Sequence, residues 1–255
     1  MTLDNQPLPS RRRRSAPGGR HRGGDSFVLP PDAPPLVLAV PGRPDAQVVA
    51  ELAALIERAH PGHTVQVADL GSLSVGPSAV VVPLVTGPHP ALDAATGTAA
   101  MLAAPLGPHP LLANALHDRL AESGLARADR VRMLTMVSAA DGIIVVTAGG
   151  QAAVADAEVT SVLLASRLAI PVMTVALDGG PTVADAADRL RKAGTARVAL
   201  APCLVGPEAD LRALIAEAAA AGAACAEPLG AHPALAQLIV LRYVEALEKA
   251  WAEES

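Results

Sequence analysis

The sequence repeats itself, and this repeat constrains the fold more than any other feature. Residues 105–110 read PLGPHP and residues 228–233 read PLGAHP, so the two hexapeptides agree at five of six positions. Each precedes a long stretch with apolar residues at helical spacing. An earlier pair supports the repeat, because PLVTGPH at 83–89 corresponds to PCLVGPE at 202–208. The chain is therefore expected to contain two halves that share one architecture.

Short β-branched runs alternate with amphipathic segments in both halves, which predicts an α/β fold with two duplicated doubly wound lobes and parallel sheets. Strands are expected at residues 36–40, 64–68, 79–85, 101–103, 142–147, 171–177, 197–203 and 223–226. Helices are expected at residues 45–59, 110–123, 152–168, 182–193, 208–221 and 233–252. The predicted N-terminal lobe spans 36–125 and the C-terminal lobe 126–255. Ligands should bind in the cleft between the lobes, where the carboxyl ends of the strands face each other.

The two halves differ in one segment. Gly42 and Gly149 are 107 residues apart in the sequence, whereas Pro83 and Pro202 are 119 apart, so the first half is shorter before its third strand. The second half uses this segment for the helix at 182–193, and the first half has only residues 71–78 there. Because a parallel connection normally needs a dozen or more residues, either the strand order changes or that sheet edge is left open.

Residues 1–35 differ in composition from the rest. They hold six arginines and three aspartates, whereas the whole chain has a net charge of −5. No apolar stretch follows Arg11–Arg14, which excludes a secretory signal. Composition favours a solvated, disordered basic tail, with contact to RNA or an anionic partner as the alternative. The acidic remainder, with one Trp, one Tyr and one Phe, predicts no nucleic-acid binding.

Apolar and cysteine residues indicate the compartment. No run approaches the roughly 20 apolar residues that span a bilayer, so no membrane association is expected. Cys203 and Cys225 form no disulfide framework and have no metal-ligand spacing. A reducing, cytoplasmic location is the simpler interpretation. A homodimer is left open.

The duplicated lobes, the PLGxHP segments and the Gly87-Pro88-His89 turn resemble the sirohydrochlorin cobalto- and ferrochelatases. These class II chelatases insert a divalent metal into a tetrapyrrole without ATP. The resemblance covers about residues 36–250 and implies a tetrapyrrole substrate, Co²⁺ or Fe²⁺ as the inserted metal, no organic cofactor, and a place in siroheme or cobalamin biosynthesis.

The resemblance also implies a site. The family's first strand ends in a His-Gly-Ser turn, but this chain has Pro41-Gly42-Arg43 there, so the metal-binding histidine is replaced. The second motif, G-x-H with an Asp four residues later, is kept as His89 and Asp93. We therefore expect His89 to bind metal and move protons, with Asp93 assisting.

Binding of the substrate's carboxylates requires local donors on an acidic protein. Arg43 supplies a positive charge, and Gly42, Gly87, Gly149 and Gly150 supply backbone N–H groups, in part near helix N-termini.

Each candidate has a structural alternative. His89 could cap the helix that begins near Pro90, and Asp93 could be a solvated helix residue. Glu208, the repeat equivalent of His89, is expected to be structural. His109 and His232 recur before a proline and are expected to cap helices. The remaining histidines, His60, His63 and His117, are expected at the surface.

Two functional hypotheses follow. The first is a sirohydrochlorin chelatase-like enzyme that uses His89 and Asp93. The alternative is a non-catalytic paralogue that binds a tetrapyrrole or metal for carriage or regulation, which the Pro41 replacement motivates. A third hypothesis, weaker on these residues, is an α/β scaffold that acts through its basic tail.

Overall fold

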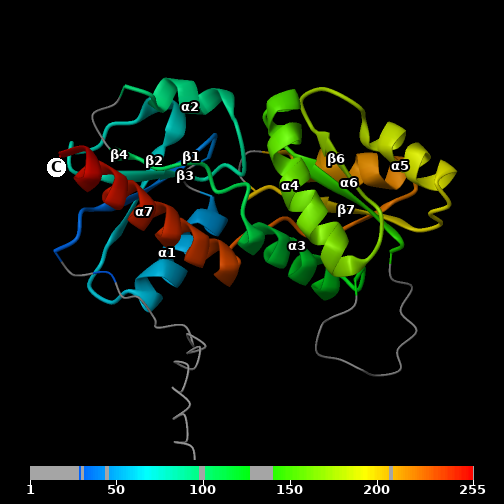
Figure 1. The fold of residues 1–255 in the computed structure, drawn as a ribbon, viewed down its shortest axis with the longest axis horizontal. Helices are drawn as coiled ribbons and strands as arrows, with labels where there is room; N and C mark the ends of the chain where they lie inside the picture. Colours follow the sequence, from blue (N-terminus) through cyan, green and yellow to red (C-terminus); the bar gives the residue numbers. More distant parts are fainter. Residues whose placement is uncertain are drawn as a thin grey trace, which may run out of the picture.

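A computed structural model describes residue 29 and residues 32–43, 46–97, 101–126, 140–206 and 209–254 (Figure 1). Residues 1–28 of the predicted tail and Glu208 lie outside the described residues. The first half contains β1 (Leu36–Val40), α1 (Gln47–Ala59), β2 (Val65–Asp69), η1 (Leu70–Ser72), β3 (Val80–Pro83), α2 (Pro90–Ala95), β4 (Met101–Leu102) and α3 (Pro110–Glu122). The second half contains β5 (Gly142–Thr147), α4 (Gly150–Leu168), β6 (Val172–Ala176), α5 (Val183–Lys192), β7 (Val198–Pro202), α6 (Leu211–Ala220), β8 (Ala224–Cys225) and α7 (Pro233–Glu254).

The strands form two parallel four-stranded sheets with the same topology. Their orders are β2-β1-β3-β4 and β6-β5-β7-β8, and β1 and β5 pair with their neighbours in corresponding registers. All residues of β1 and β5 are buried, as expected for central strands covered by helices on both faces. The duplicated α/β fold predicted from the repeat is confirmed.

The shorter first half keeps its strand order. A single 3₁₀ turn, η1, stands where the second half has α5, and η1 packs against the short helix α2. Leu70 in η1 and Ala95 in α2 cover Val37, Val81 and their neighbours on this face of the sheet. This face of the first sheet is therefore covered by two short elements, η1 and α2, where the second half has the helices α5 and α6.

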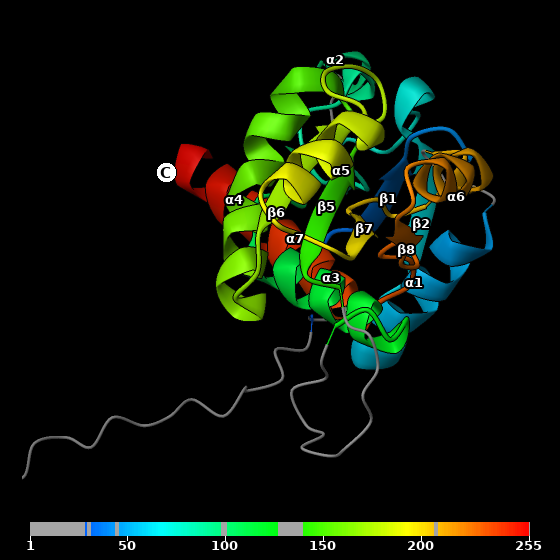
Figure 2. The same cartoon turned by 90° about the vertical axis from the view of Figure 1, so that its right-hand side faces the viewer.

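The last helix of each half lies on the other half. Helix α3 packs against α4 and β7 of the second sheet, whereas α7 packs against α1, β3 and β4 of the first (Figures 1 and 2). One core cluster accordingly contains Leu38 and Val82 from the first sheet together with Ile143, Ala199 and Tyr243. The boundary near residue 125 stays a prediction, but helix packing crosses it in both directions.

Packing begins before the predicted start at Leu36. The Leu29 side chain is 2% exposed, and its backbone N–H donates to Nδ1 of His60 at 3.1 Å. The Tyr243 hydroxyl donates to the Pro34 carbonyl oxygen at 2.6 Å. Residues directly before β1 therefore belong to the packed structure.

The surface location predicted for three histidines is wrong. His60, His63 and His117 are 7%, 6% and 2% exposed. His60 receives the Leu29 N–H, and the His63 ring meets Tyr243 edge-on at 5.7 Å between centroids. These contacts come from segments far apart in sequence, so local pattern did not reveal them. Within the described ranges, no helix is long and apolar enough to cross a membrane.

Candidate functional site

The loop after β3 joins the two lobes. In this loop, the Thr86 hydroxyl donates to the Cys203 carbonyl oxygen at 2.8 Å, and Gly87 is buried against Ala153 of α4. The carbonyl oxygen of Pro88 lies so close to Gly149 that a Cβ at Gly149 would overlap it. The carboxyl ends of β3, β5 and β7 therefore meet at one place, as an inter-lobe site requires.

His89 lies in this junction, half-buried, and caps α2. Its Nδ1 accepts the Ala91 backbone N–H at 3.1 Å, and Pro90 occupies the first helical position. Because a neutral imidazole has one acceptor and one donor, the cap places the ring proton on Nε2. Burial lowers the pKa of His89 below its ordinary value, opposed by the negative charge of Asp178.

The charge acting on His89 comes from Asp178, a residue that the sequence did not single out. Asp178 follows β6, and its carboxylate accepts the Gly149 N–H at 2.9 and 3.0 Å and the Gly150 N–H at 2.9 Å. Burial opposes ionisation of Asp178, but these hydrogen bonds outweigh it and hold its pKa below the ordinary value. The repeat offers no equivalent signal, because the first half has η1 at the corresponding place.

Gly149 and Gly150 have left-handed backbone, with φ of 110° and 68°, and this conformation turns both N–H groups toward Asp178. Since α4 begins at Gly150, its positive end is already neutralised by a carboxylate of this chain. A substrate carboxylate that used these two N–H groups would have to displace Asp178.

The other predicted residues follow β1 or lie in α2. Pro41 is buried after β1, whereas Gly42 and Arg43 are exposed, with Gly42 at φ 90°. Asp93 is exposed one helical turn beyond His89. The structure thus brings Gly87, His89, Gly149 and Gly150 together, and it leaves Asp93 in the first turn of α2, facing solvent.

The other two capping histidines behave as expected. Nδ1 of His109 accepts the Leu111 N–H at 3.1 Å, and Nδ1 of His232 accepts the Ala234 N–H at 3.2 Å. His89, His109 and His232 thus share one cap geometry. Among the residues that the structure describes, no three His, Cys, Asp or Glu side chains form a group that could hold a metal ion.

No protein-family model and no curated protein matches the sequence. Solved structures do match. The SirB protein of Bacillus subtilis with Fe³⁺ is 15% identical with a TM-score of 0.60, covering 84% of this chain and 95% of that one. The sirohydrochlorin chelatase SirB from B. subtilis subspecies spizizenii, in complex with cobalt, is 13% identical with a TM-score of 0.56, covering 84% and 96%.

A third similar structure is a multi-domain protein of Deinococcus radiodurans, described as structurally similar to chelatases with two additional novel domains. It is 17% identical with a TM-score of 0.54, and the match covers 84% of this chain and 55% of that protein. At these identities the likeness establishes the fold. The chain therefore has the chelatase-like α/β fold, and the resemblance stated from the sequence is confirmed at that level.

Proposed function

We propose that the chain is a sirohydrochlorin chelatase-type protein that inserts Co²⁺ or Fe²⁺ into a tetrapyrrole held where the carboxyl ends of the two sheets meet. The position of His89 carries this proposal. The imidazole lies half-buried at the junction of the two lobes, on the loop whose Pro88 contacts Gly149 of the other lobe. The chelatase-like fold supports the substrate class.

Metal insertion requires two pyrrole protons to leave and a partly dehydrated cation to reach the ring nitrogens. An imidazole can bind such a cation and accept such a proton near neutral pH. In His89 the Nδ1 lone pair is engaged by Ala91, so Nε2 carries the proton. Binding of a metal ion at Nε2 therefore requires that proton to leave, or to move to Nδ1 with loss of the cap. Metal binding at His89 is therefore coupled to the hydrogen bond that caps the first turn of α2.

The neighbouring residues complete the proposed site. Asp178 adds a negative charge beside His89, which attracts a divalent cation. Asp93 would assist from the first turn of α2. The exposed Gly42 and Arg43 would receive substrate carboxylates, together with the backbone at Gly87. Gly149 and Gly150 would contribute indirectly, because they hold Asp178.

A second candidate is a non-catalytic paralogue that binds a tetrapyrrole or metal. Pro41 favours it, because this buried side chain has no donor atom at the position where the resemblance implies a histidine. The cap on Nδ1 of His89 favours it too, since the resting ring offers an N–H and not a lone pair at Nε2. In either function we place the chain in the reducing cytoplasm, where Cys203 and Cys225 stay in the thiol form.

An anaerobic insertion assay separates the two candidates. Sirohydrochlorin and Co²⁺ are mixed with the protein, and the absorbance change is compared with the spontaneous reaction. We expect acceleration by the wild type and its loss in His89→Asn, because asparagine keeps an N-cap oxygen but removes the imidazole. The matched control is His109→Asn, which changes an equivalent cap elsewhere and should retain activity.

The remaining outcomes are also informative. Saturable tetrapyrrole binding without acceleration supports the non-catalytic paralogue. Acceleration that persists in His89→Asn removes His89 from the mechanism. Absence of tetrapyrrole binding contradicts the chelatase, and absence of both tetrapyrrole and Co²⁺ binding contradicts the second candidate too.

A further inference from the structure

The chain just before β1 is anchored by a histidine. The Leu29 side chain is 2% exposed and belongs to the same core cluster as Ile56 and Tyr243. Its backbone N–H donates to Nδ1 of His60 at 3.1 Å, in a buried position. His60 ends α1, and its own backbone N–H donates to the Ile56 carbonyl oxygen. The first residue that the structure describes is therefore attached to α1 through the lone pair of an imidazole.

A second contact attaches the same segment to α7. The Tyr243 hydroxyl donates to the Pro34 carbonyl oxygen, and the Tyr243 ring meets the His63 ring edge-on. His63 is buried, and its Nε2 has no hydrogen-bond partner among the described residues. Leu29 and Pro34 are thus held by three buried side chains, His60, His63 and Tyr243, which are called the latch below.

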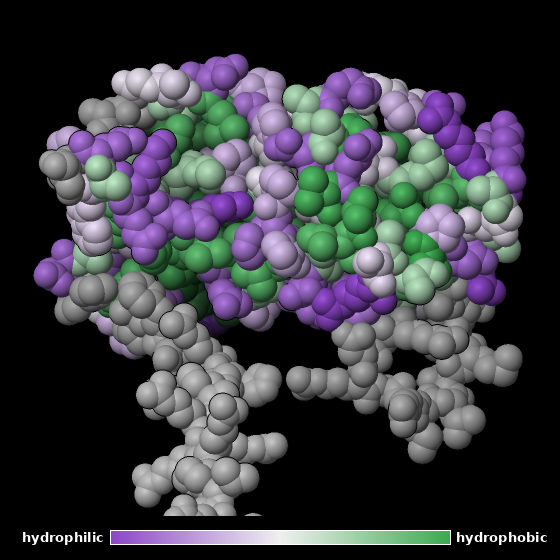
Figure 3. All heavy atoms as spheres, viewed as in Figure 1, coloured by the Kyte–Doolittle hydropathy of each residue, from purple (hydrophilic) through white to green (hydrophobic). Residues whose placement is uncertain are grey.

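The charged groups of the elements around the latch are exposed or engaged elsewhere. On α1, Arg58 is exposed, and the Glu57 carboxylate accepts a backbone N–H of β2 at 3.0 Å. Asp32, in the segment before β1, is exposed as well. Hydrophilic side chains cover the outer face of α7 (Figure 3), and its exposed charged residues include Glu245, Glu248 and Lys249. The charge that acts on His60 is that of the other imidazole, His63.

Acid acts on one contact of the latch and spares the other. Burial lowers the pKa of His60 and of His63 below the ordinary 6.5, and the neighbouring His63 lowers the pKa of His60 further. A proton on Nδ1 of His60 removes the lone pair that accepts the Leu29 N–H. Burial raises the pKa of Tyr243 to about 12, so its hydroxyl keeps its proton and its bond to Pro34 in acid.

The direction of the effect follows from proton linkage. A His60 ring that is exposed to water takes up a proton near its ordinary pKa of 6.5, whereas the buried ring does so only at lower pH. The attached state is therefore favoured above pH 6.5, and it loses this advantage as the pH falls through the lowered pKa.

We propose that the latch is a proton-operated anchor, in which protonation of His60 detaches Leu29 from α1 while both sheets stay folded. Detachment exposes one leucine and breaks one hydrogen bond to α1, whereas unfolding exposes both sheets, so detachment requires less free energy. The arginine-rich residues 1–28 directly precede Leu29 in the sequence, so the state of the latch decides where that segment is attached.

Amide hydrogen exchange of the full chain, followed by NMR between pH 7.5 and pH 5, tests the proposal. The protection factor of the Leu29 amide should fall by about 5-fold between pH 7 and pH 5, because detachment is coupled to uptake of a proton. The amide of Leu38, which is buried in the central strand β1, is the internal reference. It should stay at least about 100-fold better protected than Leu29 at every pH.

Two substitutions at one position separate the proton from the hydrogen bond. His60→Asn keeps an acceptor near the position of Nδ1 but does not titrate, so it should lose most of the fall in Leu29 protection. His60→Leu removes the acceptor and should give low Leu29 protection already at pH 7.5. His109→Asn, which replaces a capping histidine of α3, is the matched control and should keep the wild-type pH dependence.

Three results would overturn the proposal. The first is a Leu29 amide whose protection does not change between pH 7 and pH 5. The second is a His60→Asn variant that keeps the wild-type fall, because the proton would then act at another group. The third is equal protection of Leu29 and Leu38, which would show that Leu29 detaches only when the first sheet unfolds.

Discussion

Arg119 and Arg242 make reciprocal contacts: each donates to a carbonyl oxygen in the turn that precedes the helix of the other. Arg119 on α3 donates to Leu229 through Nε at 3.1 Å and Nη2 at 2.8 Å. Arg242 on α7 donates through Nη2 to Leu106 at 3.3 Å. Leu106 and Leu229 are the leucines of the two PLGxHP segments. The packing of α3 on the second half and of α7 on the first is therefore held by two arginines at equivalent positions of the repeat.

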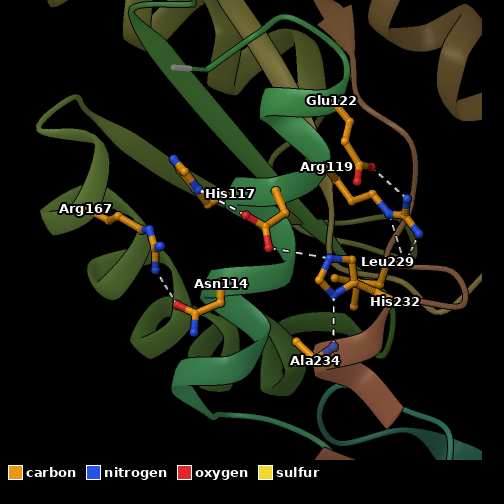
Figure 4. A network of polar contacts seen from close by, with 9 residues as sticks. Asn114, His117, Arg119, Glu122, Arg167, Leu229, His232 and Ala234 are labelled. Carbon is orange, nitrogen blue, oxygen red and sulfur yellow. Dashed lines mark hydrogen bonds and ion pairs between the residues drawn. The ribbon is translucent and has the colours of Figure 1, made fainter. Parts of the chain in front are cut away.

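Charged neighbours accompany both of these contacts but differ between them. Arg119 also pairs with Glu122 at 2.8 Å, as Figure 4 shows. Arg242 pairs with Glu245 at 2.8 Å. On the α3 side, the Asp118 carboxylate lies 3.5 Å from Nε2 of His232. The position that corresponds to Asp118 on α7 holds Leu241, so the two contacts are related but not identical.

Substitution of these arginines should destabilise the fold. Arg119→Ala leaves the Leu229 carbonyl without its donors, and we expect a loss of about 2 kcal/mol in the free energy of unfolding. Arg242→Ala should lose about 1 kcal/mol, because it removes one longer hydrogen bond. Urea unfolding followed by circular dichroism measures both. The exposed Arg58→Ala is the control, and equal stability of Arg119→Ala and Arg58→Ala would contradict the contact.

Much of the fold could be predicted from the sequence, because strand and helix periodicity is local. The expected strand at 142–147 agrees with the structure, and so does the helix expected at 182–193, which is α5 (Val183–Lys192). The repeat also indicated the missing helix of the first half. The packing of α3 and α7 on the opposite halves was not predicted, although Arg119 and Arg242 each stand ten residues after the histidine of their PLGxHP segment. Periodicity identifies an apolar helix face but not which sheet it covers.

The candidate site was less accessible to sequence reasoning. The loop with His89 was identified from a motif, and so was its alternative role as a helix cap. Asp178 was missed because its contact with Gly149 joins residues 29 apart in sequence across two loops. Asp93 was chosen instead, since it stands one turn from His89, but proximity along a helix does not decide which carboxylate acts on a ring in a neighbouring loop.

The contact between Pro88 and Gly149 gives a matched pair of glycine variants. Gly149→Ala places a Cβ against the Pro88 carbonyl oxygen and keeps a left-handed residue, so we expect a loss of more than about 3 kcal/mol of stability. Gly150→Ala meets nothing within 4 Å and should lose only about 1 kcal/mol for its positive φ. Equal effects in thermal unfolding would show that the lobes do not press together at Gly149.

Asp178 variants separate its charge from its hydrogen bonds. Asp178→Asn keeps an oxygen that can accept the Gly149 and Gly150 N–H groups, whereas Asp178→Ala leaves both unpaired. We expect Asp178→Ala to lose about 1–3 kcal/mol and Asp178→Asn clearly less. Both should lower the pKa of His89 further, because they remove the charge that raises it. An NMR titration of the His89 ring measures this pKa, and Asp93→Asn is the control that should not change it.

Acidification should destabilise the fold in a range set by histidines. Burial lowers the pKa of five histidines below the ordinary value of 6.5: His60, His63, His89, His109 and His232. Below 6.5 the unfolded chain takes up protons that the folded chain refuses, so the free energy of unfolding falls as the pH decreases through the lowered values. Protonation also removes Nδ1 acceptors, such as that of His60 for the Leu29 N–H.

Thermal unfolding between pH 7.5 and pH 5 measures this effect, and the melting temperature should decrease steadily below about pH 6.5. Asp178 and Asp185 should not contribute in this range, because their pKa values lie below the ordinary 3.8 and both carboxylates stay ionised. In His60→Asn the part of the slope due to that ring should disappear, since asparagine does not titrate. A melting temperature that rises on acidification to pH 5 would mean that these rings are charged in the folded chain, contrary to their burial.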